Sequence, residues 1–369
     1  MVNPALVEAR LTALGLAAPT SDTPAQVLDR FGPMQGQELP GVTSSIALRL
    51  AGSDATAATA VEDAFTTGSV VRGYPMRATV FALAARDAAW VTELCAGPQR
   101  RQSRRRLEQD GLSSTDIGTA HDLLREHPDG LSRPDLAILW SSHGLPETRT
   151  FLYLLVRDMM LHGTAVYGPP DDSGGQLIVP AESWLPAGSD LAGRFNGDTT
   201  AATADLLLRY LHGHGPAGLR DFAWWTKLPV TLIRDAFGLI RDEVEPAASF
   251  SPALGEDAWV RPGLADEITV AAKAAHGTFL LPAFDELVLG YRDRLVFLTG
   301  DHHDEVAPGN NGAFRKTVVR GGKFVATWRA PKTAPTSGAG RRLTVSPFRP
   351  LSTAAERDIT RTFRSYPHA

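Results

Sequence analysis

Two glutamines, Gln35 and Gln37, stand one residue apart and closely follow the helix-breaking pair Gly32-Pro33. Side chains two residues apart diverge by about 200° on a helix, but they point to the same side of an extended chain. Because Gly32 and Pro33 favour extended backbone at this point, we expect the two neutral amides to converge on one spot. Taken alone, such a pair is more typical of glutamines at a surface or in a turn.

Other catalytic signatures are absent from the sequence. It contains no P-loop, no dinucleotide-binding fingerprint, no Gly-x-Ser-x-Gly and no His-Glu-x-x-His. A metal site is conceivable at Asp301-His302-His303-Asp304-Glu305, with His212 and His214 as further ligands, but no third ligand follows at the usual spacing. We therefore expect neither a metal nor another cofactor. The single cysteine, Cys95, excludes internal disulfides and a cysteine-based zinc site.

The composition is that of an ordinary globular protein. The chain has 369 residues, of which 43% are hydrophobic and 21% are charged. At roughly 150 residues per domain this length corresponds to two or three domains. No apolar run approaches the roughly 18 residues that a membrane span needs, and residues 1–5 do not begin a secretory signal. We expect a protein of the cytoplasm that does not enter a membrane.

Positive charge is concentrated in two segments although the net charge is −4. Residues 306–355 contain nine lysines and arginines and no acidic residue, and residues 100–106 contain five arginines. Since the local field decides whether a polyanion binds, a mildly acidic protein with two basic surfaces can still hold nucleic acid. Either segment alone is equally consistent with a solvated charged face.

Most of the chain repeats one theme, in which helices are followed by a two-stranded ribbon. In the first copy Thr23 and Pro24 predict a helix start, and Gly68 predicts a helix end. The expected helices span 4–16, 24–30, 42–50, 55–67, 117–125, 133–140, 147–162, 200–211, 219–226 and 229–239. The expected ribbon strands span 70–71 and 76–83 around a turn at 73–75, then 164–167, 176–179, 243–245 and 258–260. Helices with a following wing indicate winged-helix units.

The pattern changes to short strands from Phe279 onward. Strands are expected at 288–289, 295–298, 317–319, 323–328 and 343–345, with hairpin turns at 309–312 and 321–322 and a final helix at 353–365. We therefore predict an α+β protein of concave shape. Its expected domains are three tandem winged-helix units over 1–98, 99–199 and 200–278, and a β-barrel-like domain over 279–369.

Five segments in chain order carry a likeness to a known family. They are Leu28-Asp29-Arg30-Phe31-Gly32-Pro33-Met34-Gln35-Gly36-Gln37, Met76-Arg77-Ala78-Thr79-Val80, residues 280–294, Asn311-Gly312-Ala313-Phe314-Arg315 and Val325-Ala326-Thr327-Trp328-Arg329. Over nearly its whole length the chain resembles the bacterial winged-helix DNA glycosylases of the AlkZ/YcaQ family. The first segment is similar to the family's catalytic Gln-x-Gln or Gln-x-Asp stretch, and residues 280–294 are the most specific match.

Three positions depart from the family pattern. Gly36 replaces an aliphatic residue, Ala78 replaces a glycine, and Phe81 replaces a common histidine. Gln37, where other members have aspartate, places the chain nearer the AlkZ branch, which confers self-resistance on producers of DNA-alkylating antibiotics. That biology is a hypothesis for this chain.

The resemblance implies a monofunctional DNA glycosylase that acts on cationic N7-alkylated purines, including bulky adducts and interstrand crosslinks. Such a base is already a good leaving group and needs no general acid. What remains is to place a water under the anomeric carbon and to stabilise an oxocarbenium-like transition state. Gln37 would accept a hydrogen bond from the water, and Gln35 would fix its orientation. Lysines are few and none lies near the pair in sequence, so we expect no Schiff base.

The expected partner is double-stranded DNA that carries alkylated purines, bound by a monomer associated with the nucleoid. A bulky crosslink is hard to flip into a pocket, so an open channel around the duplex would suit it better. The residues expected to bind DNA are Arg77, Asn311, Arg315, Lys316, Arg320 and Lys323, the last four on a basic hairpin.

Two alternatives lack a catalytic step. Winged helices are common in transcription regulators, but the first candidate recognition helix, at 55–67, has two acids and no base. Pressed into a major groove, it would repel phosphate. The other alternative is a sensor that binds damaged DNA, or the damaging drug, without cutting a bond.

Overall fold

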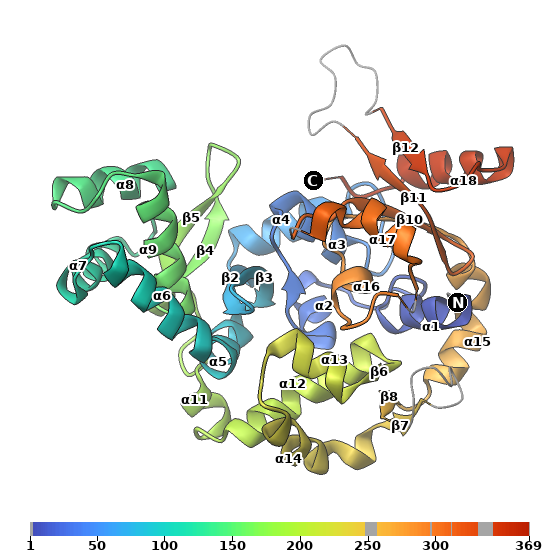
Figure 1. Cartoon of the computed structure of the whole chain (residues 1–369), viewed down its shortest axis with the longest axis horizontal. Helices are drawn as coiled ribbons and strands as arrows, with labels where there is room; N and C mark the ends of the chain where they lie inside the picture. The colour runs from blue at the N-terminus through green and yellow to red at the C-terminus, as the bar shows by residue number, and fades with distance from the viewer. Residues whose placement is uncertain (1–2, 248–256, 296, 311, 331–341, 369) are drawn as a thin grey trace.

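The computed structural model describes residues 3–247, 257–295, 297–310, 312–330 and 342–368. It is a mixture of helices and antiparallel sheets (Figure 1). The expected order, in which helices precede a two-stranded ribbon, occurs in all three copies. Within the described ranges, no helix is both long enough and apolar enough to cross a bilayer.

In the first set of helices, two boundaries lie where the capping residues predict them. Thr23 accepts a hydrogen bond from the main chain of Gln26, whose side chain bonds back to Thr23, so the second helix starts with a complete capping box. Gly68 follows the end of the fourth helix at a φ of +75°, a conformation that favours glycine. These helices are α1 (Pro4–Ala13), α2 (Pro24–Phe31), α3 (Leu39–Ala47), α4 (Ala57–Thr66) and α5 (Ala85–Cys95).

A five-stranded sheet joins the first ribbon to the second. Its strands are β1 (Met34–Gln35), β2 (Val70–Met76), β3 (Thr79–Ala84), β4 (Ala165–Pro170) and β5 (Gln176–Pro180), in the order β1-β3-β2-β4-β5. The predicted turn at 73–75 is wrong, because those residues belong to β2. The chain turns instead at Arg77 and Ala78, each at a φ of +54°, as a tight two-residue hairpin loop requires.

The second set of helices forms a lobe with its own apolar core, on the left of Figure 1. Its helices are α6 (Gly97–Gln109), α7 (Ser114–Arg125), α8 (Arg133–Ser142) and α9 (Arg149–Leu161). The five-arginine segment 100–106 falls within α6, a helix that the sequence patterns did not predict.

The third set lies along the bottom and right of Figure 1. Its helices are α10 (Ala181–Trp184), α11 (Leu191–Phe195), α12 (Thr199–His214), α13 (Leu219–Thr226), α14 (Val230–Ile240), the 3-10 helix η1 (Arg241–Glu243) and α15 (Leu264–Ala275). The strands β6 (Ala217–Gly218), β7 (Glu245–Pro246) and β8 (Ala258–Val260) form a small sheet in the order β6-β8-β7. Buried side chains of α12 and α13 belong to the largest core, which also takes in residues from β2, β3 and the short helix α16 (Glu286–Leu289).

The C-terminal part is an open sheet, so the predicted barrel is wrong. Its strands are β9 (Thr278–Leu281), β10 (Lys316–Arg320), β11 (Lys323–Arg329) and β12 (Thr344–Pro347), in the order β12-β11-β10-β9. The first and last strands in this order do not pair within the described residues, and residues 288–289, expected as a strand, belong to helix α16 (Glu286–Leu289). Residues 353–364 form α18 (Thr353–Arg364), which packs on the sheet, and α17 (Gly300–Val306) and the 3-10 helix η3 (Pro308–Asn310) precede β10.

Candidate active site

Gln35 lies on an extended strand, whereas Gln37 lies in the bend that follows it, so the extended backbone predicted for both is found only at Gln35. Gln35 is the last residue of β1 and stands opposite Phe81 of β3 in antiparallel register. Gly32 leaves α2 at a φ of +76°, with Trp225 only 3.3 Å from where its Cβ would be. The left-handed backbone and this close contact both favour glycine at position 32. The break in the helix at Gly32 thus turns the chain onto the edge of the sheet.

Gly36 packs directly on the backbone of β3. A Cβ at this position would lie 3.0 Å from the Ala82 nitrogen and 3.1 Å from the Phe81 carbonyl carbon. The Gly36 N–H donates to the Val80 carbonyl at 2.7 Å, and its own carbonyl accepts from Arg72 at 2.6 and 3.0 Å. At position 36 this chain has glycine instead of the family's aliphatic residue. The missing side chain allows the loop to pack directly on the backbone of β3.

The main chain of Gln35 is held by a buried carboxylate. The Gln35 N–H donates to Oε1 of Glu286 at 2.7 Å, and the other Glu286 oxygen lies 3.2 Å from Nε2 of His214. The neighbouring residue Asp285 forms a fully buried ion pair at 2.9 Å with Arg49, just after α3, and accepts a hydrogen bond from Ser45 of α3. Residues 285–286 thus anchor both the glutamine strand and the helix that follows it.

The side chain of Gln35 is oriented by Arg77. Nη2 of Arg77 donates to Oε1 of Gln35 at 2.9 Å, and Gln35 is only 6% exposed. A guanidinium has only donors, so the amide atom that faces it must be the oxygen. This leaves the Gln35 NH₂ group as the part of the side chain that can act on a substrate. Burial lowers the pKa of Arg77 to about 10, against the opposing charge of Glu286.

Gln37 is held much less tightly. Its side chain is exposed, and its Oε1 accepts a hydrogen bond of 3.4 Å from the Val80 N–H. This bond is at the long end of the range for N–H···O contacts. Oε1 of Gln37 is therefore an acceptor that can take a better-placed hydrogen. The two glutamines are not equivalent, since Gln35 offers a donor and Gln37 offers an acceptor.

Three cations surround Trp224 of α13 beside this pair. The guanidinium carbons of Arg77 and Arg294 lie 4.8 and 5.5 Å from the indole ring, and Nζ of Lys227 lies 5.5 Å from it. The pKa of Lys227 is lowered by burial and by the charge of Arg77. The expectation that no lysine stands near the glutamines in sequence holds, but the fold brings Lys227 to the ring that Arg77 contacts.

Several of these residues were not identified from the sequence. Glu286 and Arg294 lie in the segment 280–294, which was recognised as family-specific but given no role. That match is the one signal that could have singled them out. Trp224 and Lys227 carry no local signal, because their proximity to Arg77 depends on how α13 packs.

The residues predicted to bind DNA do not form one group. Arg77 lies at the glutamines, whereas the other four described residues are divided between the two ends of β10. Lys316 stands opposite Trp328 at one end, and Arg320 stands opposite Lys323 at the other. The remaining predicted residue, Asn311, lies outside the described residues.

The four cations on β10 and beside it also differ in their partners. Arg315 pairs with Glu305 at 3.3 Å and Arg320 with Asp358 at 3.1 Å. Nζ of Lys316 lies 4.7 Å from the Trp328 ring, and Lys323 is exposed.

A cavity of about 460 Å³ connects the glutamine loop with the C-terminal sheet. It includes Glu38, the neighbour of Gln37, on one side and three cations on the other. It is lined by Glu38, Ala283, Phe314, Arg315, Lys316, Thr327, Trp328, Arg329, Ala330 and Ser346. Of the two ends of β10, the end with Arg315 and Lys316 is therefore the one that faces the loop.

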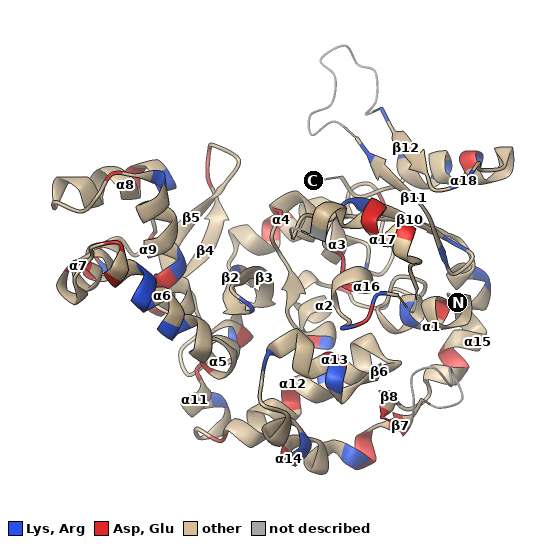
Figure 2. Cartoon of the chain, viewed as in Figure 1, with Lys and Arg blue, Asp and Glu red and all other residues tan. Residues whose placement is uncertain are grey.

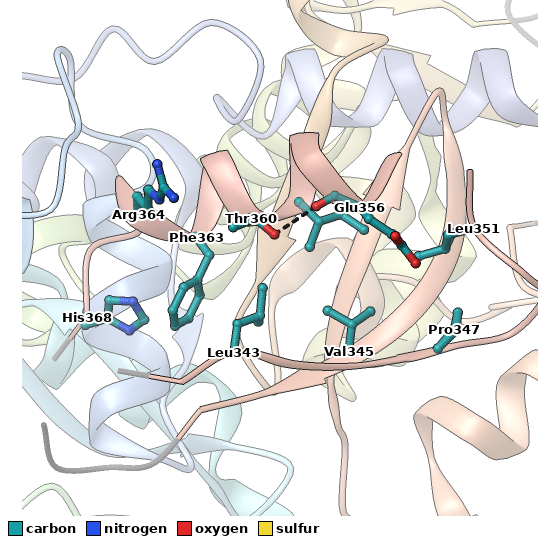
Figure 3. Close-up of a pocket in the computed structure, with 10 residues that line it drawn as sticks. Leu343, Val345, Pro347, Leu351, Glu356, Thr360, Phe363, Arg364 and His368 are labelled. Atoms are coloured by element: carbon teal, nitrogen blue, oxygen red, sulfur yellow. Dashed lines mark hydrogen bonds between the residues drawn. The ribbon is translucent and has the colours of Figure 1, made fainter. Parts of the chain in front are cut away.

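A second cavity, of about 830 Å³, lies between β12 and α18 and is mainly apolar (Figure 3). Its lining includes Leu343 and Val345 from the sheet side and Ile359 and Phe363 from the helix. The Thr360 hydroxyl in its wall is already bonded to the Glu356 carbonyl. The cavity holds neither glutamine and offers no pair of groups for hydrolysis.

The residues considered as metal ligands are not assembled. His302 stacks on Phe348, and His303 lies 3.8 Å from Asp304. His212 contacts the Glu243 carbonyl, and His214 contacts Glu286. Across the part of the chain that the structure describes, no three His, Cys, Asp or Glu side chains come together to hold a metal.

Comparisons with known proteins identify the family and the fold. A sequence model of the family described as "DNA glycosylase AlkZ-like" matches residues 28–367. The solved structure of Streptomyces sahachiroi DNA glycosylase AlkZ is similar with a TM-score of 0.74 at 20% sequence identity. That similarity covers 98% of this chain and 95% of the other, and it shows a shared fold. No curated protein matches the sequence.

Proposed function

The chain belongs to the AlkZ-like DNA glycosylase family, and we propose that it hydrolyses the N-glycosidic bond of cationic N7-alkylated purines in double-stranded DNA. That it is a DNA glycosylase of DNA repair follows from the family. The non-enzymatic regulator and the sensor are therefore not the function that we infer.

The observation that carries the proposal is the fixed orientation of Gln35 beside an accessible Gln37. Because Arg77 occupies Oε1 of Gln35, the Gln35 NH₂ can donate to the oxygen of a water molecule. Oε1 of Gln37, which holds only a 3.4 Å bond to Val80, can accept a hydrogen from the same water. One donor and one acceptor orient the water's lone pair toward the anomeric carbon.

The reaction balances without an acid or a strong base. The bond between the sugar carbon and the purine nitrogen breaks, and its electron pair neutralises the cationic ring of the leaving base. The water oxygen bonds to the anomeric carbon of the oxocarbenium-like species. Its extra proton then passes to solvent, because a neutral amide orients the water but does not retain a proton. An abasic site and a free alkylpurine result.

The buried carboxylate at the site is already engaged. The Glu286 oxygens face the Gln35 N–H and His214, so Glu286 supports the strand rather than the reacting atoms. Neither glutamine can act as a general acid, so we expect neutral purines to be poor substrates for this arrangement. Its chemistry suits lesions that carry their own positive charge.

The exposure of Gln37 supports activity on bulky lesions. A residue that lies at the surface can meet an adduct, or a crosslinked base, that a closed pocket would exclude. We therefore extend the proposal to bulky adducts and to the unhooking of interstrand crosslinks. In an organism that makes a DNA-alkylating antibiotic, this activity would provide self-resistance.

Backbone phosphates next to the lesion are proposed to bind at the cavity beside Glu38. Arg315, Lys316 and Arg329 line it, and Arg315 would exchange its exposed pair with Glu305 for phosphate. Exposed ion pairs contribute roughly 0–1 kcal/mol, so this exchange costs little. Arg320 and Lys323, at the far end of β10, are less well placed for the same task.

The test is Gln37→Ala under single-turnover conditions, with a duplex that carries one N7-methylguanine and alkaline cleavage of the abasic product. We expect the excision rate to fall by about 100-fold or more, as for loss of a group that acts in the transition state. Affinity for the same duplex should stay within a few-fold of wild type, because Gln37 carries no charge. An unchanged rate would remove Gln37 from the mechanism.

A further inference from the structure

The five-arginine segment 100–106 has no role in the proposed reaction. It lies on α6, in the lobe on the left of Figure 2, apart from the basic residues of β10 and β11. A cavity of about 450 Å³ opens beside it, where α6 packs against α9. The cavity is lined by Pro98, Arg101, Gln102, Arg105, Arg106, Gln109 and Arg157. Four of these seven residues are arginines and none is acidic.

Three arginines of α6 already have partners. Arg100 donates to the carbonyls of Thr92 and Glu93 and so links α6 to α5. Arg104 pairs with the buried Asp158 at 3.2 Å, and Arg106 pairs with Asp110 at 2.8 Å. The fold alone is sufficient to explain why these three positions are basic.

The other arginines of the cavity are different. In the described ranges, the side chains of Arg101, Arg105 and Arg157 make no hydrogen bond or ion pair. Nε of Arg157 is buried and has no acceptor. A buried donor without a partner costs on the order of 1–3 kcal/mol, and like charges at the i,i+4 spacing of Arg101 and Arg105 also destabilise a helix. Several acceptor oxygens from outside the chain would relieve both costs.

A merely solvated face of a helix looks different in this protein. Helix α18 also carries several arginines, but it intersperses them with acids, and Asp358 pairs with both Arg320 and Arg361. The cavity on α6 has no such acid in its lining. The absence of a counter-charge, the concave shape and the buried Nε of Arg157 together indicate an anion site.

We propose that this cavity is a second contact with the DNA backbone, which holds phosphates of the duplex away from the reacting sugar. Guanidinium groups match phosphate oxygens with two parallel hydrogen bonds. Arg101 and Arg105 are one turn apart, about 6 Å along the helix axis. One strand carries a phosphate for about every 3.4 Å of duplex axis, so the two arginines can engage neighbouring phosphates. The inference rests on action on duplex DNA, not on the class of lesion.

The test compares two double variants that remove the same charge. Arg101→Gln/Arg105→Gln alters the cavity, and Arg234→Gln/Arg357→Gln is the matched control at exposed sites on α14 and α18. Affinity for an undamaged duplex is measured as a function of salt. Each lost phosphate contact should reduce the slope of log affinity against log salt concentration by about 0.9. The cavity variant should lose two phosphate contacts, so its slope should fall by about twice that amount. The slope of the control variant should not change.

A second readout separates this inference from the proposed reaction. At saturating enzyme, the cavity variant should excise N7-methylguanine at the wild-type single-turnover rate, because its arginines do not touch the reacting atoms. A salt slope equal to that of wild type or of the control would overturn the inference. The inference would also be overturned if the cavity substitutions reduced the salt dependence of binding to a single-stranded RNA of the same length but not of binding to the duplex. The cavity would then bind another polyanion.

Discussion

Arg77 holds the side chain of Gln35 in one orientation. The sequence assigns it to DNA binding, whereas the structure shows its guanidinium on Oε1 of Gln35 and 4.8 Å from Trp224. We infer that it acts through Gln35, as a positioning residue that fixes which end of the amide faces the water. Its charge also strengthens the donor character of the Gln35 NH₂ by polarising the carbonyl.

Arg77→Gln should therefore impair the chemical step more than binding. Losing a hydrogen bond to a charged group costs roughly 1.5–3 kcal/mol, so we expect a 10- to 100-fold lower single-turnover rate. The matched control is Arg294→Gln, which also removes a cation beside Trp224 but has no bond to Gln35. If Arg77→Gln only weakens DNA binding and reduces its salt dependence, Arg77 contacts phosphate instead.

Lys227 is the lysine that the structure brings to the same indole ring. Burial and the charge of Arg77 lower its pKa, which increases the fraction of neutral amine at neutral pH. A neutral amine could in principle attack the sugar and form a Schiff base. The water mechanism predicts that borohydride traps no covalent enzyme–DNA complex, and that Lys227→Gln still excises the base. A trapped complex that disappears in Lys227→Gln would establish a lysine nucleophile.

At the scale of elements, the short edge strand β1 is the part on which the site depends. Its register against β3 is maintained by the close packing of Gly36 on the β3 backbone and by Arg72 of β2. The Arg72 guanidinium donates to the Gly36 carbonyl and, at 2.5 Å, to the side chain of Gln176 in β5. Burial lowers the pKa of Arg72 to about 10. Three strands of the sheet thus hold one loop between the two glutamines.

Gly36→Ala tests this dependence. The added methyl would lie 3.0 Å from the Ala82 nitrogen, and a backbone atom within a sheet cannot move aside as a side chain can. We expect a loss of about 1–3 kcal/mol in the free energy of unfolding, measured by urea titration, and a lower excision rate. Ala25→Gly, at a half-buried position on α2, is a control that changes stability without touching the loop. Unchanged stability and rate in Gly36→Ala would show that the loop has room to move.

Local signals predicted the elements better than their assembly. Capping residues such as Thr23 located helix starts, and the glycine pair at 321–322 located the β10–β11 turn. The hairpin at Arg77 and Ala78 was missed, because Gly73 and Pro75 are stronger turn residues yet lie within β2. The apolar pair 288–289 predicts a strand but belongs to helix α16, since periodicity does not distinguish a short helix from a strand.

The extended backbone at Gln35, after the helix break at Gly32, could be predicted from the sequence. What surrounds the glutamine pair could not, because Glu286 contacts Gln35 across a sequence separation of 251 residues. Trp224 likewise reaches Arg77 only through the packing of α13. Such contacts depend on the whole fold and leave no spacing pattern in the chain.

At the scale of the molecule, a chain of net charge −4 concentrates positive charge at three places. Cations gather at the indole beside the glutamines, at the cavity next to Glu38, and at the cavity between α6 and α9. These three places lie on different elements, so a duplex that meets them all would contact much of the protein. A binding surface that extends along the duplex, in place of a deep pocket, would suit a bulky or crosslinked lesion.

The most direct test of the account compares lesions of different charge in one duplex sequence. Wild-type enzyme is incubated under single-turnover conditions with N7-methylguanine, with the neutral base hypoxanthine, or with undamaged guanine, and abasic sites are cleaved with alkali. The account predicts excision of N7-methylguanine alone, because the glutamine pair supplies no acid to protonate a neutral leaving base. Comparable excision of hypoxanthine would contradict it, since a neutral purine can leave at that rate only if the site provides an acid.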